Sequence, residues 1–272
     1  ETLEKELGEN WEKEMIALNE QAPTILRANS LKTSTKHLIE ELKHENVESF
    51  QVPGFENAVQ LEEKKNVFLT SAFKDGFFEV QDAGSQKIGE FLDVKPGMRV
   101  VDACAGAGGK TLHLAALMEN KGQIIAMDIH GWKLAELKRR AKRAGAHNIE
   151  TREITDNKVI KRLHEKADRL LIDAPCSGLG VLKRNPDSKW KIDQDFIDRI
   201  RKEQETILQD YSKIIKKGGK MVYATCSILP SENNEQVENF LKNNPDFKLV
   251  KEEKVMPSTG FDGFYMALIE RV

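Results

Sequence analysis

The pattern of apolar and polar positions changes after about residue 75. From Met98 onward, short apolar runs alternate with amphipathic stretches, which indicates a parallel sheet flanked by helices. Strands are expected at 98–104, 123–129, 148–154, 168–173 and 220–226. Helices are expected at 85–92, 109–119, 131–144, 157–165, 195–216 and 231–243, with Gly218 and Gly219 stopping the helix over 195–216. Two β-rich runs, 247–255 and 264–271, predict an antiparallel hairpin at the sheet edge, so the α/β sheet has seven strands.

Residues 1–75 follow another pattern. An acidic amphipathic helix over 1–20 is followed by the strand-like segment Ile25–Asn29, a helix near 34–44 and short β-like pieces. This order predicts a small α+β domain over 1–75. Residues 76–84 carry turn chemistry and form the expected junction to a second domain over 76–272.

Composition limits the environment of the protein. The chain has 272 residues, of which 39% are hydrophobic and 32% charged, and its apolar runs are far shorter than the roughly 20 residues of a membrane span. The start at Glu1 lacks the apolar core of a signal peptide. Three scattered cysteines without a Cys-x-x-Cys pair predict free thiols in a reducing cytoplasm.

The charge pattern bears on nucleic-acid binding in two opposite ways. A formal net charge of −2 argues against a phosphate-binding surface over the whole chain. Locally, however, six basic residues crowd the predicted helix over 131–144, and Lys183 with Arg184 follows a predicted loop. Either these clusters form positive ground for nucleic acid, or they are ordinary solvated faces.

A glycine-rich loop follows the first strand of the predicted sheet. Its sequence, DACAGAGGKT over Asp102–Thr111, lets the backbone approach a ligand before a helix begins. A P-loop would need glycine where Cys104 stands, and in a dinucleotide-binding Gly-x-Gly-x-x-Gly loop the third glycine is missing, because Lys110 and Thr111 follow Gly109. The second strand ends in Asp128, whose carboxylate can accept bonds from ribose hydroxyls, which favours S-adenosylmethionine as ligand. Asp156, after the third strand, is placed for the adenine side, unless it only caps a helix.

Two cysteines follow the fourth and fifth strands. Cys176 lies in DAPCSG and Cys226 in ATCS, and the ends of such parallel strands share the ligand-binding edge of a sheet. A lone cysteine there is otherwise a small buried apolar side chain. A thiol has a use in methyl transfer to cytosine, because its addition to carbon 6 makes carbon 5 nucleophilic. An acid near ring nitrogen N3 would stabilise the charge of that attack, and Asp173 suits this role if its pKa is raised.

Taken together, these motifs resemble the Nop/Sun family of RNA cytosine-5 methyltransferases, in particular the bacterial Sun-like type that acts on 16S rRNA. Four further segments resemble the family: LRANSLKTS at 26–34, VQDAGSQ at 80–86, KRNPDSKW at 183–190 and FDGFYMALIE at 261–270. The resemblance covers nearly the whole chain. It implies a Rossmann-like methyltransferase sheet with an antiparallel last strand and a small N-terminal RNA-binding domain.

The resemblance also implies residue roles. Cys226 matches the nucleophile and Cys176 the second cysteine, which is associated with release of the methylated RNA; the residue patterns alone do not rank the two thiols. Lys110 is expected to polarise the site. The expected cofactor contacts are Cys104, Ala105, Gly106, Ala107, Gly108, Gly109, Lys110, Asp128, Asp156 and Asp173. Ala107 stands where the family usually has proline, which relaxes φ and removes no contact.

RNA contacts are implied at Arg27, Asn29 and Lys32 in the first domain and at Lys183 and Arg184 in the second. Trp132 and Trp190 are expected to pack inside the protein rather than to stack on a base. The histidines give no metal-ligand pattern, so no metal is expected, and a monomer is the default.

Two rival functions follow from the same residues. A methyltransferase that acts on an exocyclic amine would carry an Asn/Asp-Pro-Pro-aromatic loop after the fourth strand, where this chain has DAPCSG. A catalytically silent RNA-binding scaffold would keep the fold, but it would have no use for both thiols and Lys110. The substrate RNA is expected to be ribosomal, with transfer RNA as the alternative.

Overall fold

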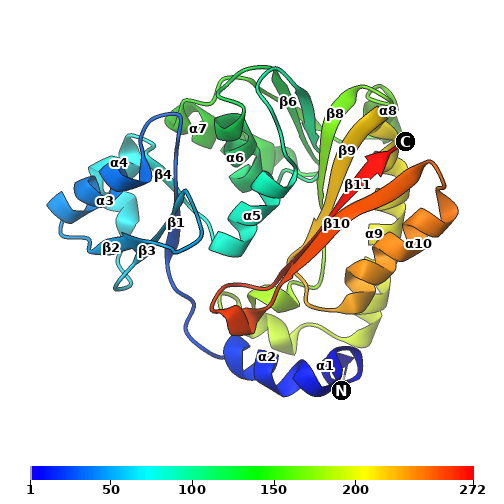
Figure 1. Cartoon of the computed structure of the whole chain (residues 1–272), viewed down its shortest axis with the longest axis horizontal. Helices are drawn as coiled ribbons and strands as arrows, with labels where there is room; N and C mark the ends of the chain where they lie inside the picture. The colour runs from blue at the N-terminus through cyan, green and yellow to red at the C-terminus, as the bar shows by residue number, and fades with distance from the viewer. Residues whose placement is uncertain (1) are drawn as a thin grey trace. The chain divides into compact units, whose positions relative to one another are not determined.

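Two β-sheets form the framework of the protein, whose computed structural model describes residues 2–272 (Figure 1). The larger sheet has seven strands in the order β10-β11-β9-β8-β5-β6-β7. Their bounds are β5 (Arg99–Asp102), β6 (Gln123–Asp128), β7 (Ile149–Glu153), β8 (Ala167–Asp173), β9 (Ile215–Thr225), β10 (Phe247–Val255) and β11 (Phe264–Arg271). β5 pairs parallel with β6, β6 with β7, and β8 with β9, whereas β11 runs antiparallel to both β9 and β10. The prediction of a seven-stranded α/β sheet with an antiparallel end is confirmed.

The chain divides into two compact units, residues 23–155 and residues 1–22 with 156–272. The first unit holds a four-stranded antiparallel sheet in the order β2-β3-β1-β4. Its strands are β1 (Ile25–Ala28), β2 (Ser49–Gln51), β3 (Ala58–Leu61) and β4 (Phe78–Val80). The helices α3 (Thr35–His44) and α4 (Ser71–Lys74) supply apolar side chains to its core, where Leu26, Leu38 and Phe78 are fully buried. The expected α+β character of this segment is therefore present.

Three further helices belong to the first unit: α5 (Ala83–Phe91), α6 (Gly109–Leu117) and α7 (Gly131–Ala144). The buried residues Leu134, Leu137, Ala141 and Ala144 recur every three or four positions of α7, which is the spacing of one helix face. The helix ends at Gly145, whose φ of 71° is the left-handed conformation of a helix C-terminus. The apolar periodicity thus determines which face of α7 is buried. Lys138, Arg139 and Lys142 are exposed, whereas Arg140 and Arg143 are partly buried and pair with Glu79.

The second unit contains α1 (Thr2–Leu7), α2 (Trp11–Leu18), α8 (Asn157–Lys161), α9 (Gln194–Tyr211) and α10 (Asn234–Asn243). Leu18 of α2 is buried with Leu179 and Leu229, and the buried Glu14 bonds to Ser258 in the turn after β10, beside which α2 lies in Figure 1. These contacts explain why residues 1–22 cluster with residues 156–272. The division does not coincide with the domain boundary expected after residue 75, and β4 lies beyond that boundary although it pairs with β1.

One predicted boundary is wrong. Helix α9 ends at Tyr211, a single 3-10 turn follows over Ser212–Ile214, and the strand β9 already begins at Ile215. Gly218 and Gly219 therefore lie inside the strand. The pairing with β8 jumps from Ala167↔Ile215 to Arg169↔Lys220, so the intervening residues bulge out, and Gly218 takes the φ of 75° that the bulge requires. Within residues 2–272, no helix is long and apolar enough to cross a membrane.

Candidate active site

The glycine-rich loop of the first unit connects β5 to α6. The amide of Ala105 donates to the carbonyl of Met127 at 2.8 Å, which fixes the loop beside the end of β6. Gly108 has a φ of 89°, and a Cβ there would lie 2.5 Å from Leu137 Cγ. Gly106 also has a positive φ, but a Cβ there would meet nothing within 4 Å. Gly108 therefore serves close packing against α7, whereas Gly106 borders open space in which a ligand can lie.

Two arginines hold the carbonyl groups of this loop. Arg27 donates to the carbonyl of Gly109 at 2.7 Å and also to Gln81, and Arg140 donates to the carbonyl of Ala107 at 2.8 Å. Buried Glu79 pairs with Arg140 at 2.9 Å. Burial lowers the pKa of the Arg27 guanidinium to about 9, with Glu79 opposing the shift, so Arg27 stays charged at neutral pH. Arg27 and Arg140 together thus form a cationic brace that holds this loop.

The carboxylate of Asp128 lies next to the same loop. Its two oxygens accept the amide of Gly106 at 2.9 Å and the amide of His130 at 2.8 Å. The side chain is 8% exposed, and each carboxylate oxygen can accept one bond more. Behind it, the hydroxyl of Thr111 donates to Asp102 at 2.7 Å and ties the start of α6 to the end of β5. The structure thus brings Asp128 and the glycine loop together, as predicted.

Asp156 and Asp173 belong to the second unit. Asp156 is exposed and accepts the amide of Lys158 at 2.7 Å, so in this structure it is the N-terminal cap of α8. Asp173 is the last residue of β8, opposite Ala224 of β9. Their expected cofactor contacts, and the contact expected of Lys110 in the first turn of α6, stay predictions.

The two cysteines of the second unit lie together. Cys176 follows β8 and Cys226 follows β9, and their sulfur atoms are 3.3 Å apart. The hydrogen bond with Cys226, together with burial and the negative charge of Glu232, raises the pKa of the Cys176 thiol well above its ordinary value. Neither thiol is in a disulfide, and both are partly exposed. The pair therefore brings two thiols within reach of one substrate group.

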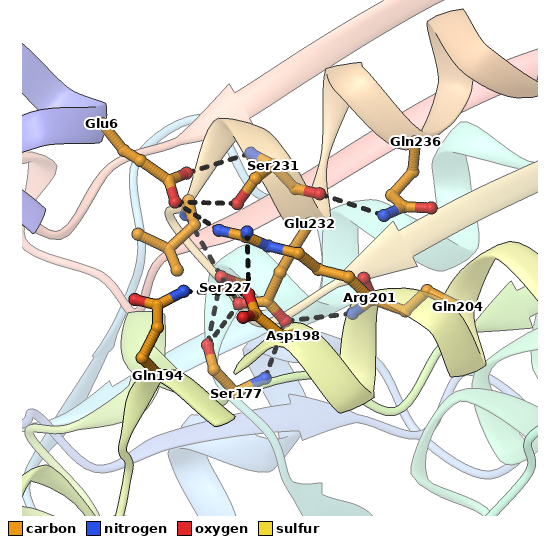
Figure 2. A network of polar contacts seen from close by, with 11 residues as sticks. Glu6, Ser177, Gln194, Asp198, Arg201, Gln204, Ser227, Ser231, Glu232 and Gln236 are labelled. Carbon is orange, nitrogen blue, oxygen red and sulfur yellow. Dashed lines mark hydrogen bonds and ion pairs between the residues drawn. The ribbon is translucent and has the colours of Figure 1, made fainter. Parts of the chain in front are cut away.

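A buried carboxylate holds the residues that follow both cysteines (Figure 2). Glu232, in the 3-10 turn Pro230–Glu232, is fully buried and accepts bonds from Ser177 and Ser227. The neighbouring Ser231 is itself bonded by Glu6 of α1. Sequence reasoning missed this network. The available signal was the repeated Cys-Ser pair, in which a hydroxyl follows each thiol directly.

The residues expected to contact RNA have protein partners. Arg27 and Asn29 are buried, and Asn29 donates to the carbonyls of Gly76 and Ala144 at 2.8 Å each. Lys32 is exposed, and its ammonium group donates to two backbone carbonyls. Lys183 donates to the carbonyl of Pro257, and Arg184 pairs with Asp262. RNA contact by Arg27 or Asn29 would require these partners to be given up; for all five residues such contact stays a prediction.

The expected burial of the two tryptophans is wrong. Trp132 is 70% exposed and Trp190 is 82% exposed, each with the ammonium group of the adjacent lysine over its ring. Among residues 2–272, no group of three or more histidine, cysteine or acidic side chains is arranged to hold a metal ion.

Comparison with known proteins places these features in a family. The profile described as 16S rRNA methyltransferase RsmB/F matches residues 90–269, and that of the RsmF/B-like ferredoxin-like domain matches residues 1–68. A ribosomal RNA small subunit methyltransferase B of Proteus mirabilis is 34% identical over 266 residues, which are 97% of this chain and 62% of that protein. A probable enzyme of the same name from Synechocystis is 36% identical over 91% of this chain and 56% of its own length.

A solved structure agrees with these sequence matches. The crystal structure of a methyltransferase homolog protein from Pyrococcus horikoshii superposes with a TM-score of 0.88 at 27% identity, covering 100% of this chain and 93% of that one. The present chain spans about three fifths of the two curated relatives. Since the family profile covers more than half of the chain, the protein belongs to the RsmB/F family of 16S rRNA methyltransferases.

Proposed function

We propose that this chain transfers a methyl group from S-adenosylmethionine to carbon 5 of a cytosine in small-subunit ribosomal RNA. The observation that carries the proposal is the pair of thiols at the ends of β8 and β9, 3.3 Å apart. Transfer to an exocyclic amine or to a ribose hydroxyl needs no thiol, whereas carbon 5 of cytosine needs one to become nucleophilic. The ribosomal substrate is inferred from the names of the relatives.

The first unit fits the cofactor. Gly106 leaves open space beside the loop, and Asp128 has acceptor capacity for the ribose hydroxyls. Because Arg27 and Arg140 engage loop carbonyls, the bonding of those carbonyls is satisfied from the protein side. When bound, S-adenosylmethionine supplies an electrophilic methyl group on a sulfonium centre.

The thiols account for the remaining steps. The Cys226 thiolate forms a bond to carbon 6 of the cytosine, and the electron pair of the 5,6 double bond becomes available at carbon 5. Carbon 5 takes the methyl group and later loses its proton to a base. The electron pair of that carbon–hydrogen bond restores the double bond while the bond between sulfur and carbon 6 breaks. Cys176, beside Cys226, is placed to act on this last stage.

The two thiols are coupled through their hydrogen bond. The raised pKa of Cys176 keeps this thiol protonated at neutral pH, mainly through its hydrogen bond with Cys226. A protonated thiol is a poor nucleophile but a usable proton carrier. The assignment of attack to Cys226 and of release to Cys176 comes from the family resemblance, and a protonated Cys176 is compatible with it.

The test uses unmodified 16S rRNA transcribed in vitro, labelled S-adenosylmethionine and three proteins: wild type, Cys176→Ala and Cys226→Ala. Covalent protein–RNA adducts are resolved on a denaturing gel, and the methylated base is identified by mass spectrometry of nucleosides. We expect 5-methylcytidine with wild type, an accumulating adduct with Cys176→Ala, and neither adduct nor methylation with Cys226→Ala.

Other outcomes have defined meanings. An adduct that accumulates only in Cys226→Ala would exchange the two roles. A wild-type protein that binds the cofactor but methylates neither ribosomal nor transfer RNA would favour the silent scaffold. Methylation of transfer RNA alone would change the proposed substrate and keep the proposed chemistry. Cytoplasmic location and the monomeric state stay predictions from the sequence.

A further inference from the structure

Each reactive cysteine is followed by a serine, and both serines bond to one carboxylate. Ser177 follows Cys176 after β8, and Ser227 follows Cys226 after β9. Both serines are buried, as is Glu232, which none of the proposed chemical steps uses. Figure 2 shows the two serine side chains pointing to Glu232 from two separate loops. The two thiols are thus linked through a single side chain.

The bonding of Glu232 is complete. Its Oε1 accepts the hydroxyls of Ser177 at 2.5 Å and Ser227 at 2.7 Å. Its Oε2 accepts the amide of Ser177 at 2.8 Å and the side-chain amide of Gln204 at 3.0 Å. Four donors around two oxygens is the environment of an ionised carboxylate, since a carboxylic acid would bring a donor of its own.

The serine hydroxyls also organise the loops beyond them. Ser177 Oγ accepts the amide of Leu179 at 3.4 Å, and Ser227 Oγ accepts the amide of Leu229 at 3.1 Å. Each hydroxyl therefore donates to Glu232 and accepts from the backbone two residues on. In Glu232→Gln the side-chain NH2 group would face groups that themselves donate, so at least one of these hydrogen bonds would be lost.

We propose that Glu232 is a positioning residue for methyl transfer, which holds the two cysteine loops together through Ser177 and Ser227 and keeps the thiols as a pair. The proposal rests on the proposed function, because only a reaction that uses two thiols in turn needs them paired. One part of it, that a single carboxylate positions both sulfur atoms, can be tested on the protein without RNA.

The charge of Glu232 adds an electrostatic effect to the geometric one. A buried negative charge disfavours a thiolate nearby, and Glu232 contributes to the raised pKa of Cys176. Removing the charge therefore lowers the pKa of Cys176 and increases its thiolate fraction at a given pH. At the same time the loops lose their common anchor, so Cys226 is less well placed for attack. Removing the charge should therefore raise the reactivity of Cys176 and lower the rate of methylation.

The experiment measures alkylation of each cysteine by iodoacetamide, with mass spectrometry of the peptides, in wild type and in Glu232→Gln. Cys104, in the other compact unit, is the internal reference. Glu235→Gln, an exposed neighbour in α10, is the matched control. We expect the rate ratio of Cys176 to Cys104 to rise about threefold to tenfold in Glu232→Gln, with the pH midpoint of Cys176 alkylation falling by up to about one pH unit. Glu235→Gln should match wild type.

Two further variants keep the test decisive if Glu232→Gln does not fold. Ser177→Ala removes one hydroxyl from the Cys176 loop, and Ser227→Ala removes one from the Cys226 loop. Each should change the alkylation rate of both cysteines relative to Cys104, because the loops share one anchor. A change confined to the neighbouring cysteine would overturn the coupling.

The remaining outcomes separate this inference from the proposed function. A lower melting temperature with unchanged alkylation ratios and unchanged pH midpoint would make Glu232 a residue of stability alone and overturn the inference. With the expected alkylation result, the rate of methylation should fall at least tenfold in Glu232→Gln, and so should the adduct that accumulates when this change is combined with Cys176→Ala. If wild type methylates no RNA and Cys176→Ala traps no adduct, the proposed function fails, and so does the role in methyl transfer, while the control of the thiols stands.

Discussion

The glycine loop and the two cysteine loops are both held by buried charges, but the charges have opposite sign. Arg27 and Arg140 donate to the carbonyls of Gly109 and Ala107. Glu232 accepts from the amide and hydroxyl groups that follow the two cysteines. Both arrangements stiffen loops that follow strands, where local hydrogen bonding alone leaves polar groups unsatisfied.

The difference in sign suits the chemistry of each loop. The cationic brace, Arg27 and Arg140, occupies carbonyl groups of the loop that is proposed to bind S-adenosylmethionine. An anionic brace occupies amide and hydroxyl groups and suppresses ionisation of a neighbouring thiol. The charge that stabilises a loop thus also sets the electrostatic conditions in which its functional groups work.

The largest effect is expected for Arg27→Met, which removes one of the two arginines that hold the glycine loop. The substitution leaves Gln81 and the carbonyl of Gly109 without their donor and removes the buried positive charge that interacts with Glu79, so we expect a loss of about 4 kcal/mol in the free energy of unfolding. S-adenosylmethionine affinity, measured by calorimetry without RNA, should fall at least tenfold. Lys32→Met, an exposed change in the same segment, should cost under about 1 kcal/mol. Unchanged cofactor affinity in a folded Arg27→Met would refute the brace and return Arg27 to RNA contact.

The next largest effect separates packing from ligand space within the glycine loop. In Gly108→Ala the new methyl group meets Leu137 in a left-handed backbone, so the expected destabilisation is about 3 kcal/mol. Gly106→Ala has the backbone strain without the collision and should cost about 1 kcal/mol. Denaturant unfolding without ligand measures both. Equal losses would show that the neighbouring helix α7 relaxes freely.

The region around Arg27 should also show a pH dependence of the free energy of unfolding, through the buried His113. His113 of α6 is buried, and burial, followed by the charge of Arg27, holds its pKa well below the ordinary 6.5. As pH falls below 6.5, the unfolded chain takes up a proton that the folded chain refuses, so stability is present above that pH and lost below it. Relative to His113→Leu, wild type should lose about 1.4 kcal/mol between pH of about 7.5 and about 5.5. Parallel stability curves for the two proteins would contradict this.

The smallest expected effect concerns Asp156, which caps α8 in the structure and is predicted to reach adenine. Asp156→Ala removes the cap and should lower the free energy of unfolding by about 1 kcal/mol, whereas Asp156→Ser keeps a capping oxygen and should stay near wild type. If Asp156 contacts the cofactor, the loss of its carboxylate should weaken the affinity for S-adenosylmethionine about threefold in both variants. Affinity equal to wild type in both would leave Asp156 as a cap only.

The two regions also differ in how far their sequences predicted them. The glycine loop, Asp128 and the strand ends at Cys176 and Cys226 follow from periodicity, turn residues and the order of strands. The glycine pair Gly218–Gly219 misled, because a left-handed residue marks a bulge inside a strand as well as the end of a helix. The exposure of Trp132 and Trp190 was also missed, since ring size alone does not supply a neighbour to pack against.

Local sequence patterns were enough to predict the α/β class, the sheet of seven strands, the position of the glycine loop and the two loops that carry thiols. These depend on backbone preferences and on alternation of apolar residues over short stretches. The contacts between distant residues could not be predicted in this way: Arg27 bonds to Gly109, 82 residues away, and Glu232 bonds to Ser177, 55 residues away. Buried polar groups need hydrogen-bond partners, and the fold brings these partners from distant parts of the chain. No local sequence pattern therefore identifies them.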